Sequence, residues 1–219
     1  MSANNSKLNN TVMVYVSSFD SNTVVGEVEP AIRNDIIRKC SDTLIKQQRY
    51  CVWQLLDYAL RSCYGKGVKD LNFYIDDSGK WNCSNGVYFS LAHCNNVVAV
   101  AMCNHCVGVD VESVENFVGH VNDEKFTGRV LTEGEQKLLQ NVPIERRAET
   151  LAEMWTKKES IFKLQGGKAF VPKSIDTANV ATHSQLLTIN GEQYALSVVT
   201  HVDCDVSISA VDNIFAQYN

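Results

Sequence analysis

Hydrophobic residues recur along this chain at two different periods, and the two periods predict different elements. Residues 45–63 place apolar side chains about every 3.6 positions, which is typical of an amphipathic helix packed on a core. Residues 11–16 are β-branched and apolar, which predicts a strand. Shorter apolar runs separated by turn residues predict further strands at residues 71–75, 87–91, 97–102 and 107–112.

Cap and turn residues set the expected ends of the helices. Pro30 opens a first helix that reaches about residue 40, and Ser41-Asp42 supplies an N-cap for the second helix. Gly65 and Gly67 end that second helix.

The second half of the chain repeats this order of helix and strands. Thr132 and Glu135 form a capping box for a helix that ends near residue 140. Pro143 stands at the first position of a long helix, 144–165, which Gly166 closes. Strands are expected at 186–189, 194–199 and 206–211, the first two joined by an Asn190-Gly191 hairpin turn.

These elements predict an α+β fold. Each half contains a long helix followed by a short antiparallel meander, so we expect a pseudo-dimer of two similar lobes. The expected lobes are residues 1–106 and 107–219. No linker rich in proline, glycine or serine separates them, so we expect one compact unit with its functional site at the lobe interface.

The net charge of -5 and pI near 5.5 argue against a nucleic-acid-binding protein. A local basic group is nevertheless present in the first half. The polar start of the chain and the lack of an apolar run of about 20 residues predict a cytoplasmic protein without a membrane span. The basic group consists of Arg33, Arg38, Lys39, Lys46 and Arg49.

Eight cysteines occur, and without an export signal we expect reduced thiols. Cys103-Asn104-His105-Cys106 is a single C-x-x-C, whereas zinc sites usually show two ordered ligand pairs. The spacing therefore favours a hairpin turn carrying buried thiols over a zinc site.

Asp110 and Glu112 alternate with valines, so they share one face of a strand. Neighbouring like charges repel unless water or a cation screens them. The pair is either the solvated face of an edge strand or a site for a hard divalent cation such as Mg²⁺.

Trp155, Glu159 and Lys163 follow at four-residue steps and share one face of the long helix. By itself this face could be a solvated Glu-Lys pair. If the helix packs on the strand of Asp110, a third carboxylate and a lysine join the cation site. Carboxylates, Mg²⁺ and lysine are the equipment of phosphoryl transfer.

Four motifs resemble those of the 4′-phosphopantetheinyl transferases, in the family's order and spacing. Gly108-Val109-Asp110-Val111-Glu112 resembles G-[IV]-D-[IV]-E, and the segment from Trp155 to Lys163 resembles W-x-x-K-E-[AS]-x-x-K. The segment from Phe89 to Cys94 resembles F-[NS]-[IL]-S-H-S, and Gly79-Lys80-Trp81 resembles G-K-P. The chain length resembles the single-chain, two-lobed Sfp-type branch, and the resemblance implies its pseudo-dimeric fold.

The resemblance implies transfer of 4′-phosphopantetheine from coenzyme A to a serine of an apo acyl, peptidyl or polyketide carrier protein. Adenosine 3′,5′-bisphosphate is the other product, and the protein is expected to act as a monomer. Glu159 and Lys163 are the implied catalytic residues. Asp110, Glu112 and Glu159 are the implied ligands of Mg²⁺, with Mn²⁺ as an alternative. The implied coenzyme A contacts are Lys80, His93, Lys158 and Lys163, with Lys46 and Arg49 as a looser match.

Three residues depart from the family pattern: Ala92 and Cys94 stand where serines are usual, and Trp81 replaces proline. The carboxylates and Lys163 are retained. Two other functions use the same residues. One is a metal-dependent hydrolase of the coenzyme A pyrophosphate, and the other is a non-catalytic module that binds coenzyme A or a carrier. The sequence does not distinguish a fatty-acid from a secondary-metabolite carrier.

Overall fold

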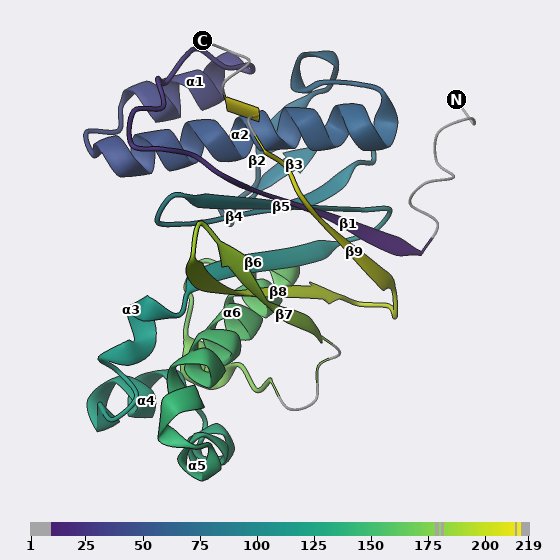
Figure 1. Ribbon diagram of the computed structural model, residues 1–219. Helices are drawn as coiled ribbons and strands as arrows, with labels where there is room; N and C mark the ends of the chain where they lie inside the picture. The colour runs from purple at the N-terminus through teal and green to yellow at the C-terminus, as the bar shows by residue number, and fades with distance from the viewer. Residues whose placement is uncertain (1–9, 178–179, 181, 213, 216–219) are drawn as a thin grey trace.

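Two small β-sheets stack face to face, and a long helix covers the outer face of each (Figure 1). The structure is a computed structural model that describes residues 10–177, 180, 182–212 and 214–215. Helices and sheets are segregated into layers, which confirms the α+β class. The first sheet has the order β4 (Tyr88–Cys94), β5 (Val97–Cys103), β1 (Thr11–Ser18) and β9 (Asp205–Ala210), and the second has the order β6 (Val107–Ser113), β8 (Glu192–Thr200) and β7 (Thr182–Ile189).

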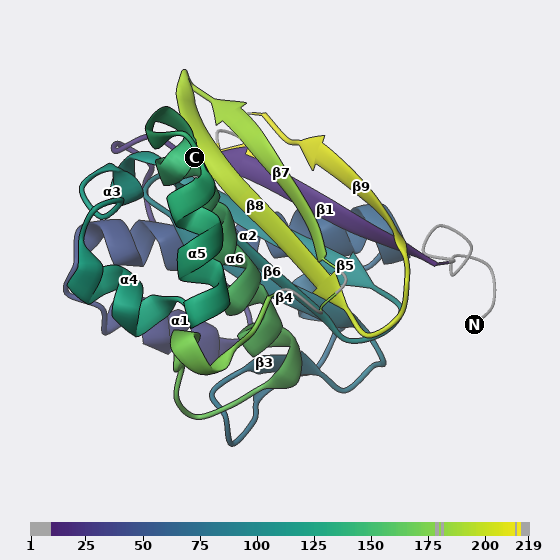
Figure 2. The same ribbon diagram turned by 90° about the horizontal axis from the view of Figure 1, so that it is seen from below.

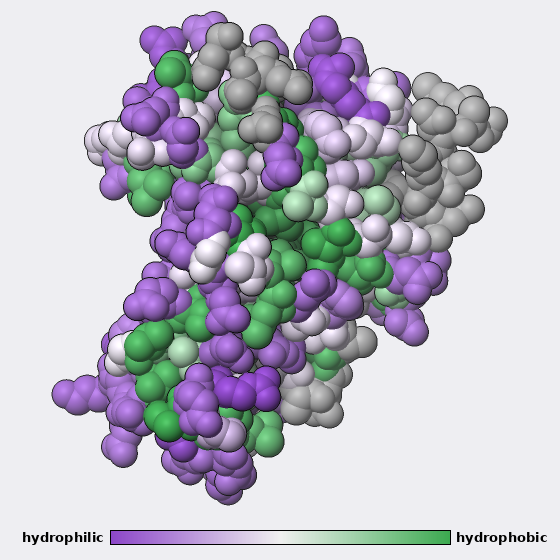
Figure 3. Space-filling view, in the orientation of Figure 1, coloured by the Kyte–Doolittle hydropathy of each residue, from purple (hydrophilic) through white to green (hydrophobic). Residues whose placement is uncertain are grey.

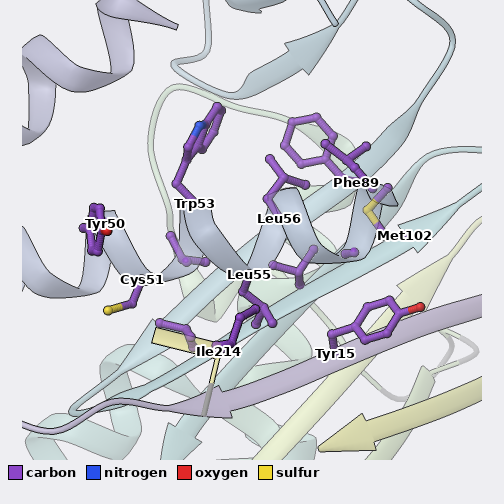
Figure 4. Close-up of a cluster of buried hydrophobic side chains, with 14 of the residues drawn as sticks. Tyr15, Tyr50, Cys51, Trp53, Leu55, Leu56, Phe89, Met102 and Ile214 are labelled. Carbon is purple, nitrogen blue, oxygen red and sulfur yellow. The ribbon is translucent and has the colours of Figure 1, made fainter. Parts of the chain in front are cut away.

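Helix α2 (Thr43–Tyr64) covers the first sheet. It begins where the Asp42 side chain accepts a hydrogen bond from the Ile45 backbone N–H at 2.9 Å, and it ends at Gly65, whose φ is 67°. Its apolar side chains are buried in one cluster, in which Leu55 points toward the strands beneath the helix (Figure 4). Trp53 points away from those strands and packs on Phe73 and Trp81. Each large side chain buried in this way contributes about 1.5–3 kcal/mol to folding.

The sheets meet through alternating residues of β1, β5 and β6. Val12 and Val14 lie opposite Val109 and Val111 in one buried cluster, so one face of each strand fills the space between the sheets. The alternation predicted for β6 is therefore confirmed, and it turns Asp110 toward the outer face of the second sheet.

Helix α6 (Arg147–Gln165) covers that outer face. A 3-10 turn, Ile144–Arg146, precedes it, so Pro143 lies before this turn and not at the first position of the α-helix. The helix lies very close to β6: a Cβ added to Gly108 would fall 1.9 Å from the Ser160 carbonyl oxygen. Ser160 Oγ also donates a hydrogen bond to the Ser197 carbonyl oxygen on β8 at 2.9 Å.

Two features differ from the expected lobes. Strand β9 follows β8 in sequence, but it crosses to the first sheet and pairs in parallel with β1, with Val12 opposite Val206 (Figure 2). The C-terminal strand thus adds to the sheet of the first half, and that sheet is mixed. The expected boundary between residues 106 and 107 falls between β5 and β6, where the chain passes from one sheet to the other. The division of the chain into two lobes at this boundary stays a prediction.

Short elements complete the chain, and the sequence pattern missed one strand and two α-helices among them. Strand β3 was missed because Trp81 and Cys83 flank a polar Asn82, and α3 and α4 were missed because helices of 4 and 7 residues are too short to show a helical period. The remaining elements are α1 (Ala31–Arg38), the 3-10 turn Val68–Asp70, β2 (Phe73–Ile75) paired with β3 (Trp81–Cys83), α3 (Glu115–Val118), α4 (Glu124–Val130), α5 (Glu133–Asn141) and the 3-10 turn Pro172–Ser174.

Trp155 and Phe162 of α6 lie at the edge of the core. Both are half-buried, and each packs on Phe170, with ring centroids 5.6 and 5.3 Å apart, while Trp155 also packs against the buried cluster that contains Leu151. Leu151 and Ile161 are the buried anchors. Helix α6 contacts the sheet through small and aliphatic side chains, because aromatic rings on that face would hold the helix too far from β6.

The surface is polar over most of its area, with hydrophobic side chains gathered between the two halves on the face shown in Figure 3. A groove of about 520 Å³ lies between β7 and β9 and is lined in part by Leu187, Ile189, Val206 and Ile208. Among the described residues, no helix combines the length and the apolarity needed to cross a bilayer.

Replacing Gly108 with alanine should destabilise the fold, because the new methyl group would overlap the backbone of Ser160. Overpacking of this kind costs about 1–3 kcal/mol or more. Urea unfolding measures the loss. Gly128→Ala is the matched control, since Gly128 lies in α4 with open space around it and its substitution should be neutral or stabilising. Equal stabilities for the two variants would contradict the close approach of α6 to β6.

Candidate functional site

Three carboxylates meet where α6 crosses β6. Asp110 and Glu112 project from β6 toward the helix, and Glu159 projects from α6. Asp110 is 4% exposed, and its Oδ2 has no hydrogen-bond partner. A buried carboxylate oxygen without a partner is costly and marks a place where a cation or a donor would be stabilised.

Lys163 lies in the middle of this group. Its Nζ is 2.7 Å from Asp110 Oδ1 and donates to the Val109 carbonyl oxygen at 3.2 Å. The sequence predicted that this lysine would lie beside the carboxylates, and the packing of α6 on β6 places it there. The sequence also allowed a surface salt bridge between Glu159 and Lys163. In the structure Lys163 forms its salt bridge with Asp110 instead.

The site carries more negative charge than it can neutralise. Burial and the neighbouring Asp110 charge raise the pKa of Glu112 to about 7, and burial and the same charge raise the pKa of Glu159 to about 7. Burial also raises the pKa of Asp110, against the opposing effect of Lys163. Both glutamates therefore change charge near neutral pH, which is common at functional sites.

Cys94 and Asn116 contact Glu112, and neither was among the site residues expected from the sequence. Cys94 Sγ lies 3.0 Å from Glu112 Oε2 and accepts a hydrogen bond from the Ser113 backbone N–H at 3.3 Å. Asn116 Nδ2 is 3.5 Å from the same carboxylate oxygen. Cys94 thus supplies the side-chain contact at a position where serine was expected. Its place four residues after the buried Ser90, on the same face of β4, was the signal available.

Cations gather on the side of the first sheet. His93 projects from the edge strand β4 and is exposed to solvent at the surface. Partial desolvation of its ring by nearby protein atoms, together with the charges of Lys163, Arg33 and Arg49, lowers its pKa to about 4. Lys80 Nζ donates to the Lys163 carbonyl oxygen at 2.6 Å. Lys46, on α2, is half-buried one turn before Arg49.

Arg33 was in the basic group of the sequence but not among the expected site residues. It is 6% exposed, and its guanidinium lies over the rings of Trp53 and Trp81 at 4.8 and 5.7 Å. It donates to the Arg49 carbonyl oxygen, and its Nε has no hydrogen-bond partner. The sequence of α1 could not show that the Arg33 guanidinium would pack on Trp81, the residue that stands in place of a proline.

A cleft of about 260 Å³ lies next to the carboxylates. Lys80 and Lys163 line it together with Phe89, Ser90 and Phe162. The edge strands β4 and β6 stack on one another, and the Val109 backbone N–H donates to Ser90 Oγ at 3.1 Å. The cleft therefore reaches the carboxylates through Lys163, which lines it and pairs with Asp110.

Lys158 is not at this site, in contrast to the coenzyme A contact expected for it. Its side chain is 0% exposed and its Nζ is 2.8 Å from Glu135 Oε2. It also donates to the carbonyl oxygens of Pro172 and Ile175. A lysine at this point of α6 therefore joins α5, α6 and the following loop, and a ligand could reach it only by opening that network.

A protein-family model matches the second half of the chain. The ACPS family model, described as the 4′-phosphopantetheinyl transferase superfamily, matches residues 106–210. This half of the chain resembles that superfamily. The matched segment contains β6, α6 and all three carboxylates.

A curated relative is the 4′-phosphopantetheinyl transferase gsp of Aneurinibacillus migulanus, 27% identical over 104 residues. The alignment covers 48% of this chain and 42% of the relative, so it spans less than half the length of either protein. A solved structure of a holo-(acyl-carrier-protein) synthase from Bacillus anthracis str. Ames in complex with CoA (3′,5′-ADP) is 21% identical, with a TM-score of 0.33. That similarity covers 43% of this chain and 94% of the other chain.

Lys158→Met should destabilise the protein by about 3 kcal/mol, because it leaves Glu135 buried without its cation. Lys157→Met is the control, since Lys157 pairs with Glu153 at the surface and such pairs contribute about 0–1 kcal/mol. Chemical unfolding measures both. A Lys158 variant as stable as the Lys157 variant would show that the buried pair does not support the fold.

The raised pKa of Glu159 predicts a stability that falls as pH rises. A folded-state pKa of about 7 lies above that of the unfolded chain, so the folded protein binds the proton more tightly. The stabilisation present below about pH 4.5 should be lost as the pH passes 7. In urea unfolding with a chelator present, Glu159→Gln should therefore exceed the wild type in stability at pH 8 but not at pH 4.5. Parallel pH profiles would contradict the raised pKa.

Proposed function

We propose that this protein transfers the 4′-phosphopantetheine group of coenzyme A to a serine of an apo-carrier protein. The observation that carries the proposal is the meeting of Asp110, Glu112, Glu159 and Lys163 beside a cationic cleft. The superfamily match over residues 106–210 and the relatives' printed activities support it. The Sfp type, with a single two-lobed chain acting as a monomer, is part of the proposal.

The donor set suits a magnesium ion. All three proposed ligands are carboxylates, and Asp110 Oδ2 is buried without a partner. Their oxygens do not come together as a closed cage, because no set of three carboxylates in the described chain has ligand atoms within 4.8 Å of one another. Mg²⁺ usually binds one or two carboxylates and completes its shell with water and phosphate, so an open arrangement fits. When bound, Mg²⁺ neutralises pyrophosphate charge, and Mn²⁺ could do the same.

The cations suit the nucleotide part of coenzyme A. Lys163, Arg33 and Arg49 lie close enough to His93 for their charges to lower its pKa, which indicates a local excess of positive charge. A phosphate group there would relieve this repulsion and favour the protonated histidine. We assign the 3′-phosphate to His93, and other coenzyme A contacts to Lys80, Lys46 and Arg49.

Glu159 is suited to accept the proton of the carrier serine. A hydroxyl needs a base to become nucleophilic, and Glu159 offers a carboxylate one helical turn from Lys163, which pairs with Asp110. The serine oxygen forms a bond to the phosphorus that carries pantetheine, and the bond from that phosphorus to adenosine 3′,5′-bisphosphate breaks. Lys163 is placed to stabilise the negative charge of the departing bisphosphate.

The proposal is tested by incubating the protein with coenzyme A, Mg²⁺ and a panel of apo-carriers from fatty-acid, polyketide and nonribosomal-peptide systems. Mass spectrometry should show a carrier that gains the phosphopantetheine mass. Asp110→Ala and Glu159→Gln should each reduce the rate by about a hundredfold or more while the protein stays folded. Glu153→Gln should have little effect, because Glu153 lies on α6 but pairs with Lys157 at the surface.

The same assay separates the other functions. Adenosine 3′,5′-bisphosphate released without any carrier would indicate a hydrolase and overturn the transfer. Tight coenzyme A binding without turnover, across the whole panel, would indicate a binding module. Full activity of Asp110→Ala would overturn the assignment of the metal ligands.

A further inference from the structure

A second cluster of metal-ligating side chains lies away from the carboxylates, at the turns that follow β5 and β8. Cys103, His105 and Cys204 bring their ligand atoms within 4.8 Å of one another. Within the described residues, it is the one such set of three histidine, cysteine or acidic side chains. The C-x-x-C of the sequence pointed to Cys106, but Cys106 is exposed and outside the cluster.

The distances fit a tetrahedral zinc ion. Zn–S bonds of about 2.3 Å and Zn–N bonds of about 2.0–2.1 Å at tetrahedral angles separate sulfur and nitrogen ligands by about 3.5 Å. Here Cys204 Sγ is 3.2 Å from His105 Nε2, and Cys103 Sγ is 3.6 Å from the same nitrogen. Two thiols and an imidazole are ligands that suit zinc better than Mg²⁺.

The histidine also has the neighbour that a metal ligand needs. His105 Nδ1 contacts Asn104 Oδ1, an oxygen that can only accept, so Nδ1 carries the proton. Nε2 is then left with its lone pair on the side of the two sulfurs. A histidine that binds a metal usually donates its other N–H to an oxygen in this way, which fixes the tautomer.

The cluster also lies where a link between the sheets would matter. Cys103 ends β5 of the first sheet, and His105 lies just before β6 of the second. Cys204 lies in the crossover from β8 of the second sheet to β9 of the first, immediately before β9 begins. A bound ion would therefore join the two connections by which the chain passes between the sheets.

We propose that Cys103, His105 and Cys204 form a structural zinc site that joins the two crossovers between the sheets. The fourth ligand is a water molecule, because His105 and Cys204 are half-buried and solvent reaches them. The site is independent of the carboxylates, and it stands whether or not the protein transfers phosphopantetheine.

The test is zinc retention by the full chain, purified with a non-thiol reductant and loaded with Zn²⁺ alone. After gel filtration, elemental analysis should find one zinc per chain in the wild type. Competition with a chromophoric chelator should show at least a tenfold loss of affinity in His105→Gln and Cys204→Ser. Thermal unfolding with and without Zn²⁺ should show a gain in Tm that both variants lose.

Two control variants show where the ion binds. Cys106→Ser should retain zinc like the wild type, because Cys106 belongs to the sequence motif but not to the cluster. Asp110→Ala should retain it as well, because Asp110 belongs to the carboxylate site. Loss of zinc in Asp110→Ala with retention in Cys204→Ser would place the ion at the carboxylates and overturn the proposal.

Other outcomes would also overturn it. A wild-type protein that retains no zinc at equimolar loading would overturn the proposal. A Cys106→Ser variant that loses as much zinc as Cys204→Ser would do the same. A mass spectrum of the reductant-purified protein that shows a Cys103–Cys204 disulfide would mean that the pair is a cross-link instead. Cobalt loading gives a further readout, since thiolate-to-cobalt absorption should appear in the wild type and decrease in Cys204→Ser.

Discussion

The contact between Gly108 of β6 and Ser160 of α6 is the constraint on which the rest of the candidate site depends. The helix can approach the strand only because Gly108 has no side chain, and because Ser160 and Thr156 bond to Ser197 instead of holding the helix away. This distance brings Lys163 Nζ to 2.7 Å from Asp110. A helix held further out by larger residues would separate Glu159 and Lys163 from the strand, and the charges would then be solvated and screened.

The charges of the site are divided between the two stacked sheets. Apart from Lys163 on α6, the cations come from the first half of the chain, on α1, α2, β4 and the turn before β3, and the carboxylates come from β6 and α6. The charges within each group repel one another. Repulsion and burial raise the pKa values of Glu112 and Glu159, and they lower the pKa of His93. A ligand that carries phosphates and binds a divalent cation would relieve both groups at once. Such a site is assembled only when the edge strands β4 and β6 are stacked together.

Buried polar groups elsewhere serve the fold instead. Lys158 neutralises Glu135, whose side chain also caps α5 through the Thr132 backbone N–H at 2.8 Å. Two lysines on one helix, Lys158 and Lys163, thus have different roles because they point to different neighbours. The Cys103, His105 and Cys204 cluster similarly depends on β9 crossing to the first sheet, since that crossover brings Cys204 beside the turn after β5.

The sequence by itself determined most of the local structure and the grouping of the four candidate site residues on β6 and α6. Periodicity and caps predicted α2, the capping box of α5 and the alternation of β6, because those signals depend on neighbours within a few residues. The motifs placed Asp110, Glu112, Glu159 and Lys163 together, and the structure brings them to one place. Only the tertiary structure decided the sheet of β9, the burial of Lys158, the support of Arg33 by Trp53 and Trp81, and the pairing of Cys204 with His105. These features depend on contacts between residues far apart in the chain. The spacing of residues along the sequence does not indicate which distant side chains will be brought into contact.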